Sequence, residues 1–349
     1  MRRSIKVFAH LAQPRQFSQM DHPILKGCRP QPTTVEPFGA NIRMEAWIGG
    51  IQNSESGTHG DILLESLPPI AVIGGSLLAL ITLLALIWLV RVRPRKPQLE
   101  ADWNSDCALT TTAEITGSTI RYTNVRDFFW RTTRDRDEAW QDTLEVDADE
   151  IKDVWFVVDH FHSIHGLAHT FLTFEFNDGT CLSFSFEARR RKGQRYHPWT
   201  GLWRHFELYL LVGFEHDVLA LRTNARGHKD YLFRGITPPG KEKALLLALT
   251  NKANSLAEKG EWYHSLLTTC NTSIVSMVNR ITPGRVPFTW RNFFPGYTPR
   301  AAYNLGLIED WGGFEQTLEQ GRVDEIALKW DGQGSYSEML RDYLPKGPQ

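Results

Sequence analysis

The feature that most constrains this chain is an apolar segment at residues 70–90, in which 21 consecutive residues carry no charge. A helix of about 20 apolar residues spans the hydrocarbon core of a bilayer. The buried helix of a soluble protein seldom stays apolar on every face over such a length. The small residues within the segment, Gly74, Gly75 and Ser76, are tolerated in membrane helices. The segment therefore predicts one transmembrane helix and excludes an ordinary soluble enzyme.

The flanks of this segment bear on its orientation. Basic side chains follow it at positions 91, 93, 95 and 96, whereas its near N-terminal flank offers only Asp61 and Glu65. The positive-inside rule then places the following domain in the cytoplasm.

The other residues divide unequally around the apolar segment. Residues 1–69 hold scattered prolines and no sustained hydrophobic period, which predicts a disordered leader. No apolar segment lies near Met1, so we expect no cleavable signal peptide, and Met44 is an alternative start from which the apolar segment would be an uncleaved signal anchor. Residues 91–100 form a linker, residues 101–310 a single domain, and residues 311–349 a C-terminal extension.

Charge and cysteine usage exclude several classes of protein. With 39 basic and 40 acidic side chains, the chain has no electrostatic footprint for nucleic acid. Its 42% of apolar residues is too high for a disordered chain. The four cysteines lie far apart with no CxxC pair, which argues against a zinc knuckle or a dense disulfide framework. One bridge between Cys107 and Cys181 is conceivable, with nothing in the sequence to support it.

The order of the predicted elements indicates the fold class. Strands are expected at 113–115 and 119–122, around a turn at 116–118, and at 154–158. Helices are expected at 241–259 and from about 268 to Arg280, where Pro283 and Gly284 follow. Strands first and helices after point to an α+β domain.

The most informative segment is a hairpin at 169–188. The even positions of both strands are apolar and the odd ones mainly polar, so both apolar sets must share one face. A two-residue turn at 178–179 would set even positions against odd. A three-residue loop at 177–179, with Gly179 in the left-handed region, matches the faces. That register places His169 opposite Glu187, with Ser185 diagonal to His169.

Cys270 is the candidate nucleophile, because Thr268 or Thr269 would cap a helix whose first turn contains it. The helix dipole and unpaired N–H groups there lower a thiol pKa and stabilise an oxyanion. A neutral His169, oriented by Glu187, would accept the thiol proton, as in covalent acyl transfer. The alternative is that Cys270 packs in the core, since cysteine is among the most buried residue types.

Other polar and aromatic residues are candidates for substrate contact, although each type is more often structural. These candidates are Arg189, Arg190, Arg222, Asn224, Arg226, Trp262 and Tyr263. The basic run at 189–192 directly follows Glu187 and would bind an anionic substrate group. The residues at 222–226 are polar loop groups by default, and Trp262 and Tyr263 are packing anchors or walls of the site.

A dense group of histidines offers a competing chemistry. His160, His162, His165 and His169 lie close together beside Asp159, and histidine is the commonest metal ligand. Their spacings fit no standard site, and a loop at 163–166 separates two strands. We therefore expect neither a metal nor another cofactor.

Several motifs in one order resemble the Lnb N-terminal periplasmic domain family over residues 102–307. The motifs are DWNSD at 102–106, AEITGSTIRYTNVRDF at 113–128, AHTFLTFEFNDG at 168–179, SFEARRRKG at 185–193, LRTNARG at 221–227, WYHSLLTTCNT at 262–272 and RVPFTWRNFFPGY at 285–297. The family is similar in layout to circularly permuted papain-like thiol hydrolases of the NlpC type. In these, a histidine at a strand start and a polar residue on the next strand precede a cysteine that opens a helix. His169, Glu187 and Cys270 match those roles, whereas Thr269 stands where the family usually has Asn.

The resemblance implies a papain-like antiparallel sheet with packed helices behind a single span of the bacterial inner membrane. It also implies a domain on the periplasmic side, against the positive-inside count. The expected activity is a cysteine hydrolase or acyltransferase acting on an amide or ester, with envelope peptides, peptidoglycan stems or lipids as the substrate pool. The alternative is a non-catalytic envelope binding or assembly module that uses the same cleft.

Overall fold

The computed structural model describes residues 69–346, so the predicted leader, with Met44 and Cys28, lies outside the described residues. The apolar segment forms helix α1 (Pro69–Ile87), which continues as a π-helical turn at Trp88–Val92. Within the described part of the chain, one helix is long and apolar enough to span a membrane, Ile70–Val92, with a mean hydropathy of 2.7. This helix contains the predicted apolar segment at 70–90.

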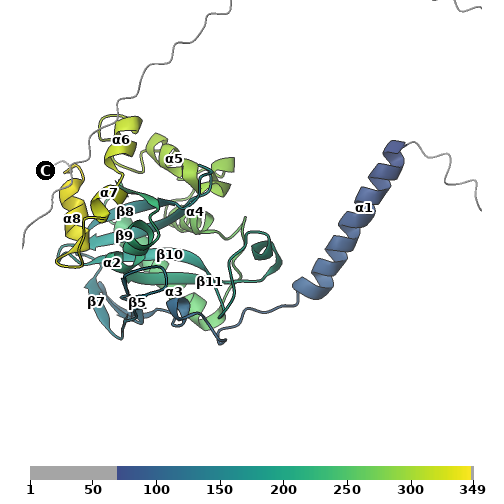
Figure 1. Cartoon of the computed structure of the whole chain (residues 1–349), viewed down its shortest axis with the longest axis horizontal. Coiled ribbons are helices and arrows are strands. Elements are labelled where there is room, and N and C mark those ends of the chain that lie inside the picture. The colour runs from purple at the N-terminus through teal and green to yellow at the C-terminus, as the bar shows by residue number, and fades with distance from the viewer. Residues whose placement is uncertain (1–68, 347–349) are drawn as a thin grey trace, which may run out of the picture. The chain divides into compact units, whose positions relative to one another are not determined.

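The domain that follows α1 mixes strands and helices, which confirms the predicted α+β class (Figure 1). The strands are β1 (Thr112–Thr116), β2 (Thr119–Thr123), β3 (Val125–Arg126), β4 (Phe129–Trp130), β5 (Arg136–Asp137), β6 (Trp140–Gln141), β7 (Leu144–Asp147), β8 (Ile151–His160), β9 (His169–Phe176), β10 (Cys181–Arg189), β11 (Glu207–Phe214) and β12 (Lys229–Arg234). The helices are α2 (Glu215–Val218), α3 (Lys241–Lys259), α4 (Cys270–Ile281), α5 (Thr298–Asn304), α6 (Phe314–Gln320), α7 (Asp324–Ala327) and α8 (Tyr336–Tyr343).

A seven-stranded sheet in the order β12-β8-β9-β10-β11-β3-β6 organises the domain. Its strand pairs are antiparallel except for the parallel contact between β11 and β3. β1, β2 and β7 form a second, three-stranded sheet, and β4 pairs with β5.

The β9–β10 hairpin has the predicted register. Leu172 pairs with Phe184, and the Phe176 amide donates to the Thr180 carbonyl at 2.9 Å. Gly179 has a φ of +86°, the left-handed conformation that a three-residue loop requires. Since side chains alternate along a strand, the even positions of β9 and β10 lie on one face of the sheet and the odd positions on the other.

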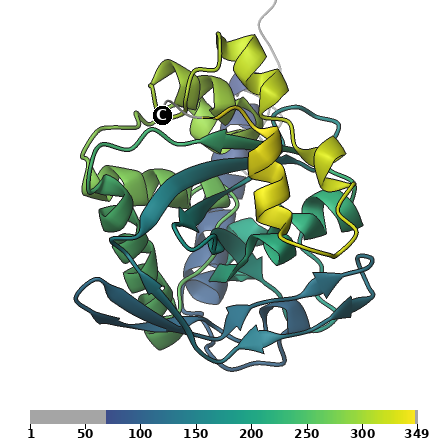
Figure 2. The ribbon, with the colours of Figure 1, turned by 90° about the vertical axis from the view of Figure 1, so that its left-hand side faces the viewer.

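Two hydrophobic cores lie on opposite faces of the sheet. The even positions of β9 and β10 pack with α3 and α4, through residues such as Leu249 and Ile274. On the other face, Phe171 packs with residues after α5, including Tyr336 and Leu340 of α8. Figure 2 shows α8, in yellow, and the green helices on different sides of the strands. The segment predicted as an extension after residue 310 therefore contributes buried side chains to the second core.

Candidate active site

The N-terminus of α4 positions Cys270. Thr269 has extended backbone angles and is the N-cap, so Cys270 is the first residue of the helix, as predicted. The Thr269 hydroxyl accepts from the Thr272 amide at 3.2 Å, and the Thr272 hydroxyl accepts from the Thr269 amide at 2.8 Å. This reciprocal capping box fixes the chain entering the helix. Thr269 thus makes the cap at the position where the family usually has Asn.

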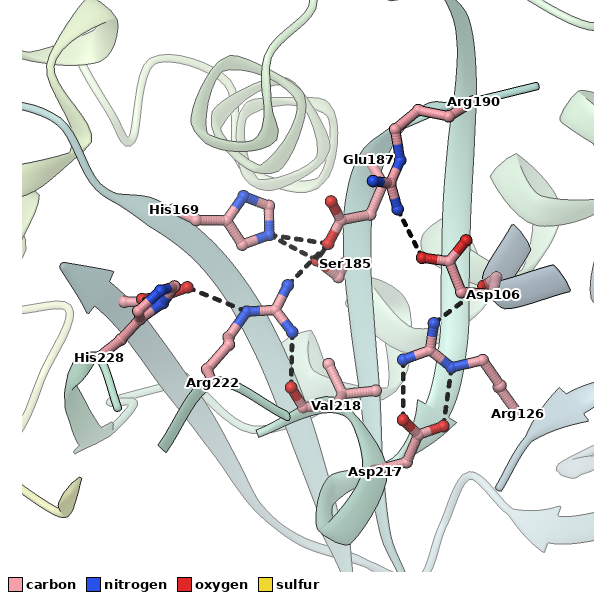
Figure 3. A network of polar contacts seen from close by, with 11 residues as sticks. Asp106, Arg126, His169, Ser185, Glu187, Arg190, Asp217, Val218, Arg222 and His228 are labelled. Atoms are coloured by element: carbon pink, nitrogen blue, oxygen red, sulfur yellow. Dashed lines mark hydrogen bonds and ion pairs between the residues drawn. The ribbon is translucent and has the colours of Figure 1, made fainter. Parts of the chain in front are cut away.

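The β9–β10 hairpin positions His169 and Glu187 (Figure 3). His169 Nε2 lies 2.7 Å from Ser185 Oγ and 3.2 Å from Glu187 Oε1. Ser185 donates to the same Glu187 oxygen at 2.8 Å. These contacts are those expected of the predicted register, with Glu187 opposite His169 and Ser185 diagonal. They fix the imidazole ring through Nε2, and Figure 3 shows its other nitrogen directed away from Glu187.

The structure also brings Cys270 to His169. Helix α4 packs against β9, and burial alone would raise the pKa of the Cys270 thiol, but the nearby charge of His169 and the polar groups of Thr170 lower it overall. Burial likewise disfavours the His169 cation, yet the charges of Glu187 and Cys270 raise the pKa of His169 to about 10. The opposite directions of the two pKa shifts favour a thiolate beside an imidazolium.

Arg222 completes the support of Glu187 from a π-helical turn at Leu221–Ala225. Its guanidinium donates to Glu187 Oε1 at 2.7 Å and to the Val218 carbonyl at 2.5 Å, and it lies 3.2 Å from Asp159 Oδ2. Burial opposes the charge on Glu187, but His169, Arg222 and Ser185 hold its pKa well below the usual range. Arg222 was predicted to contact substrate, whereas its buried side chain here orients Glu187.

Asp159 was predicted only as a neighbour of the histidine group and His228 was not predicted, but both belong to this network. Asp159 pairs with His169 across β8 and β9, and it accepts from His228 at 2.8 Å. The sequence contains a signal for Asp159, because it directly follows the strand predicted at 154–158 and lies close in sequence to His169. For His228 the sequence contains no such signal, because its place depends on how β12 aligns with β8.

Arg189 and Arg190 have internal partners rather than an open site. Arg189 is buried, stacks 4.2 Å over the Trp103 ring, and donates to the carbonyls of Cys107 and Ala108 at 2.9 and 2.7 Å. Arg190 pairs with Asp106 at 2.5 Å. Both arginines therefore connect the end of β10 to the segment at 99–108, and we do not propose that they bind substrate.

The four remaining candidates lie in different surroundings. Asn224 donates to the Ala327 carbonyl at 2.8 Å and so attaches the loop to α7. Trp262 donates to the Arg95 carbonyl at 3.3 Å. Tyr263 lies near Cys270, whose charge adds to burial in raising the tyrosine pKa. Arg226 is exposed, makes no ion pair within residues 69–346, and lies near enough to Glu187 to be affected by its charge.

The histidines before β9 form no recognisable metal site. His160 stacks on His165 with ring centroids 4.9 Å apart, and the His162 ring accepts from the Ile164 amide. In the described part of the chain, no three His, Cys, Asp or Glu side chains are grouped so that they would hold a metal ion.

An apolar cavity of about 360 Å³ lies along α4. Its walls include Leu172 of β9, Ile274 and Val278 of α4, and Ile308, with Asn271 at the end nearest the N-terminus of α4. Cys270 does not line the cavity, but the residue after it does. The cavity thus begins one residue from the candidate nucleophile.

Comparison with known proteins identifies one family. Residues 136–296 match the family model of the Lnb N-terminal periplasmic domain, and they contain His169, Glu187 and Cys270. No curated protein and no solved structure matches the chain.

Proposed function

Since residues 136–296 match the family model of the Lnb N-terminal periplasmic domain, we propose that this protein is an envelope-anchored cysteine hydrolase or acyltransferase that cleaves an amide or ester bond. The observation that carries the proposal is the proximity of Cys270 to His169 where α4 packs against β9. It lowers the pKa of the thiol and raises that of the imidazole to about 10. A structural cysteine in an apolar core would instead have a raised pKa.

The first step of the proposed reaction forms a thioester. The Cys270 thiolate attacks the carbonyl carbon of the substrate, and the carbonyl electron pair moves to oxygen. When the tetrahedral intermediate collapses, the C–O or C–N bond breaks and the imidazolium of His169 gives its proton to the departing alcohol or amine. Glu187 stabilises the imidazolium and keeps Nε2 engaged, so the other ring nitrogen is the one available to the reaction.

The second step restores the thiolate. Neutral His169 accepts a proton from water, an alcohol or an amine as that acceptor attacks the thioester carbon. The C–S bond then breaks, and the acyl group leaves on the acceptor. Water as acceptor makes the protein a hydrolase, and an alcohol or amine makes it an acyltransferase.

The N-terminus of α4 offers donors for the oxyanion. The Thr272 amide is used by the capping box and the Ser273 amide bonds the Thr269 carbonyl at 3.1 Å. For the amides of Cys270 and Asn271, residues 69–346 contain no hydrogen-bond acceptor within bonding distance. Such N–H groups at the positive end of a helix stabilise negative charge that develops on a substrate oxygen.

The layout supports a likeness to circularly permuted papain-like hydrolases. His169 opens β9, Glu187 lies on the neighbouring β10, and Cys270 opens α4, in that order along the chain. Helix α1 would hold the domain at the periplasmic face of the inner membrane. Its substrates would then come from envelope peptides, peptidoglycan stems or lipids.

The test uses an activated ester and the full chain in detergent. With p-nitrophenyl butyrate, we expect a burst of p-nitrophenol and one butyryl adduct on the peptide that contains Cys270. Cys270→Ser and His169→Asn should each reduce acylation by at least about a hundredfold, as is typical of general acid–base residues. Cys107 and Cys181 are buried thiols in the same sample and are the internal controls. Adducts spread evenly over Cys107, Cys181 and Cys270 would contradict the proposal.

The same variants separate catalysis from the alternative of a binding or assembly module. An envelope phenotype that disappears in Cys270→Ser at normal protein level supports the enzyme. A phenotype that this variant retains supports a non-catalytic module.

A further inference from the structure

Residues 93–98, which follow helix α1, are hydrogen-bonded to the domain. Arg204 donates to the Arg93 carbonyl at 2.6 Å, and the Gln98 amide donates to Glu207 at 3.2 Å. Trp262 Nε1 donates to the Arg95 carbonyl between them. Residues 93–98, predicted as a linker, are therefore held by three separate parts of the domain.

A basic cavity lies where this segment meets the domain. Its volume is about 360 Å³, and its lining includes Arg95, Lys96, Arg191, Arg204, His205 and Trp262. Arg191 pairs with Glu207 at 3.0 Å. Within residues 69–346, no carboxylate lies within ion-pair distance of the other three cations. The cavity therefore carries uncompensated positive charge.

The two arginines keep donors free for a ligand. Arg95 uses Nε on the Arg91 carbonyl and Nη1 on the Trp203 carbonyl, and Arg204 uses Nη1 on backbone carbonyls. A guanidinium has five N–H donors, so each arginine retains Nη2 at least. The backbone bonds hold both side chains in place and would pre-organise them for an anion with several oxygens.

The position of the cavity indicates the source of that anion. Arg95 is the third residue after Val92, the last residue of the candidate span. Arg204 lies 5.7 Å over the ring of Trp88, and Trp199, at the start of the adjoining turn, is 61% exposed. Tryptophan prefers the membrane–water interface, where lipid headgroups lie. Basic side chains at that depth attract anionic lipids.

We propose that this cavity binds the phosphate group of an anionic phospholipid at the end of the membrane helix. Arg95 and Arg204 hold the phosphate oxygens and Lys96 supplies further positive charge. Two of the four basic residues at 91–96, Arg95 and Lys96, are then part of a lipid site on the domain.

The experiment measures lipids retained by the full chain after release from nanodiscs of equal phosphatidylglycerol and phosphatidylcholine. Native mass spectrometry should show phosphatidylglycerol retained in preference to phosphatidylcholine. Lys96→Gln/Arg204→Gln should reduce that retention by about tenfold, as expected for losing two charged contacts. Arg134→Gln/Lys329→Gln removes the same charge at exposed positions outside the cavity and should retain the wild-type preference.

Two further measurements keep the result unambiguous. Lys96 is exposed and makes no hydrogen bond with residues 69–346, so Lys96→Glu should weaken retention without affecting folding. A titration of the detergent-solubilised chain with inorganic phosphate identifies the source of the ligand. One outcome is that the wild type binds inorganic phosphate but retains no lipid, and that Lys96→Gln/Arg204→Gln loses the phosphate binding. The cavity would then be a site for free phosphate and not for a lipid. Equal retention by wild type and both double variants, with no phosphate binding, would overturn the proposal.

Discussion

The three cysteines within residues 69–346 differ in the direction of their pKa shifts. Burial raises the pKa of Cys107 to about 11 and that of Cys181 to about 12. Cys270 is buried as well, but its pKa is lowered by His169 and Thr170. Since all three are buried, the neighbouring charge of His169 distinguishes the candidate nucleophile from two structural thiols.

Removing the imidazole should reverse the shift at Cys270. In His169→Asn the cation is lost and burial dominates, so the pKa of the thiol should rise above its ordinary value. At pH 7 the rate of carbamidomethylation at Cys270 should fall by more than about tenfold, since each pKa unit changes the thiolate fraction tenfold. Quantitative peptide mass spectrometry measures the rate. An unchanged rate would show that His169 does not activate the thiol.

The sequence predicts part of this site because part of it is local. The His169–Glu187 pair follows from hairpin periodicity, and the place of Cys270 follows from helix capping. The meeting of Cys270 with His169 depends on how α4 packs against β9, which no short-range pattern encodes. For the same reason the pairing of Arg190 with Asp106 and the stacking of Arg189 on Trp103 were not foreseen.

At the scale of elements, the cap of α4 sets the place of the nucleophile. Thr269→Ala removes the side-chain half of the capping box and should lower the free energy of unfolding by about 1 kcal/mol. Thr269→Asn restores the residue that the family usually has, and Asn caps at least as well as Thr. We expect wild-type stability for Thr269→Asn in chemical denaturation, and wild-type labelling of Cys270. Equal losses in both variants would show that the cap is not what Thr269 contributes.

A buried ion pair joins β3 to α2. Asp217 accepts from Arg126 at 2.7 and 2.8 Å, from the Phe128 amide at 3.0 Å and from Trp130 Nε1 at 2.7 Å. Asp217→Asn leaves the Arg126 charge buried without a counter-ion and should cost about 3–5 kcal/mol of folding stability. Thermal or chemical denaturation of the detergent-solubilised chain measures the loss.

An exposed ion pair on the three-stranded sheet is the matched control for Asp217. Arg121 and Glu145 lie 3.0 Å apart with more than half of each side chain exposed. Glu145→Gln should therefore change stability by no more than about 1 kcal/mol. Similar losses in the two variants would contradict the view that burial makes the Asp217 pair important.

At the scale of the whole molecule, the C-terminal helices are part of the domain. Leu340 of α8 is 0% exposed in the core on the face opposite α3 and α4, whereas Leu328 is 59% exposed. Leu340→Ala should lower stability by about 2–5 kcal/mol, because it leaves a cavity in a packed core. Leu328→Ala should change stability by less than about 0.5 kcal/mol in the same denaturation experiment. Tolerance of Leu340→Ala would restore the interpretation of this segment as an extension.

The large divisions of the fold could be predicted because they follow from composition and periodicity. The apolar span, the α+β class and the helix at 241–259 all appear as predicted. The second core could not be predicted in this way. The odd positions of β9 and β10 are mainly polar, which suggests that this face of the sheet is exposed to solvent. In the structure Thr173, Ser183 and Ser185 are buried and hydrogen-bonded, so polar side chains lie under the C-terminal helices.

The pH dependence of Cys270 alkylation by iodoacetamide tests the thiolate–imidazolium pair most directly. Because the pKa of the Cys270 thiol is lowered, its thiolate should form at a lower pH than the thiolate of a free cysteine, whose pKa is about 8.5. A His169 pKa of about 10 keeps the imidazolium beside it up to that pH. The rate should therefore rise at a lower pH than the rate of a free thiol does, and change again near pH 10, when His169 loses its proton. A single rise centred at or above about pH 8.5, as for an ordinary thiol, would contradict the account.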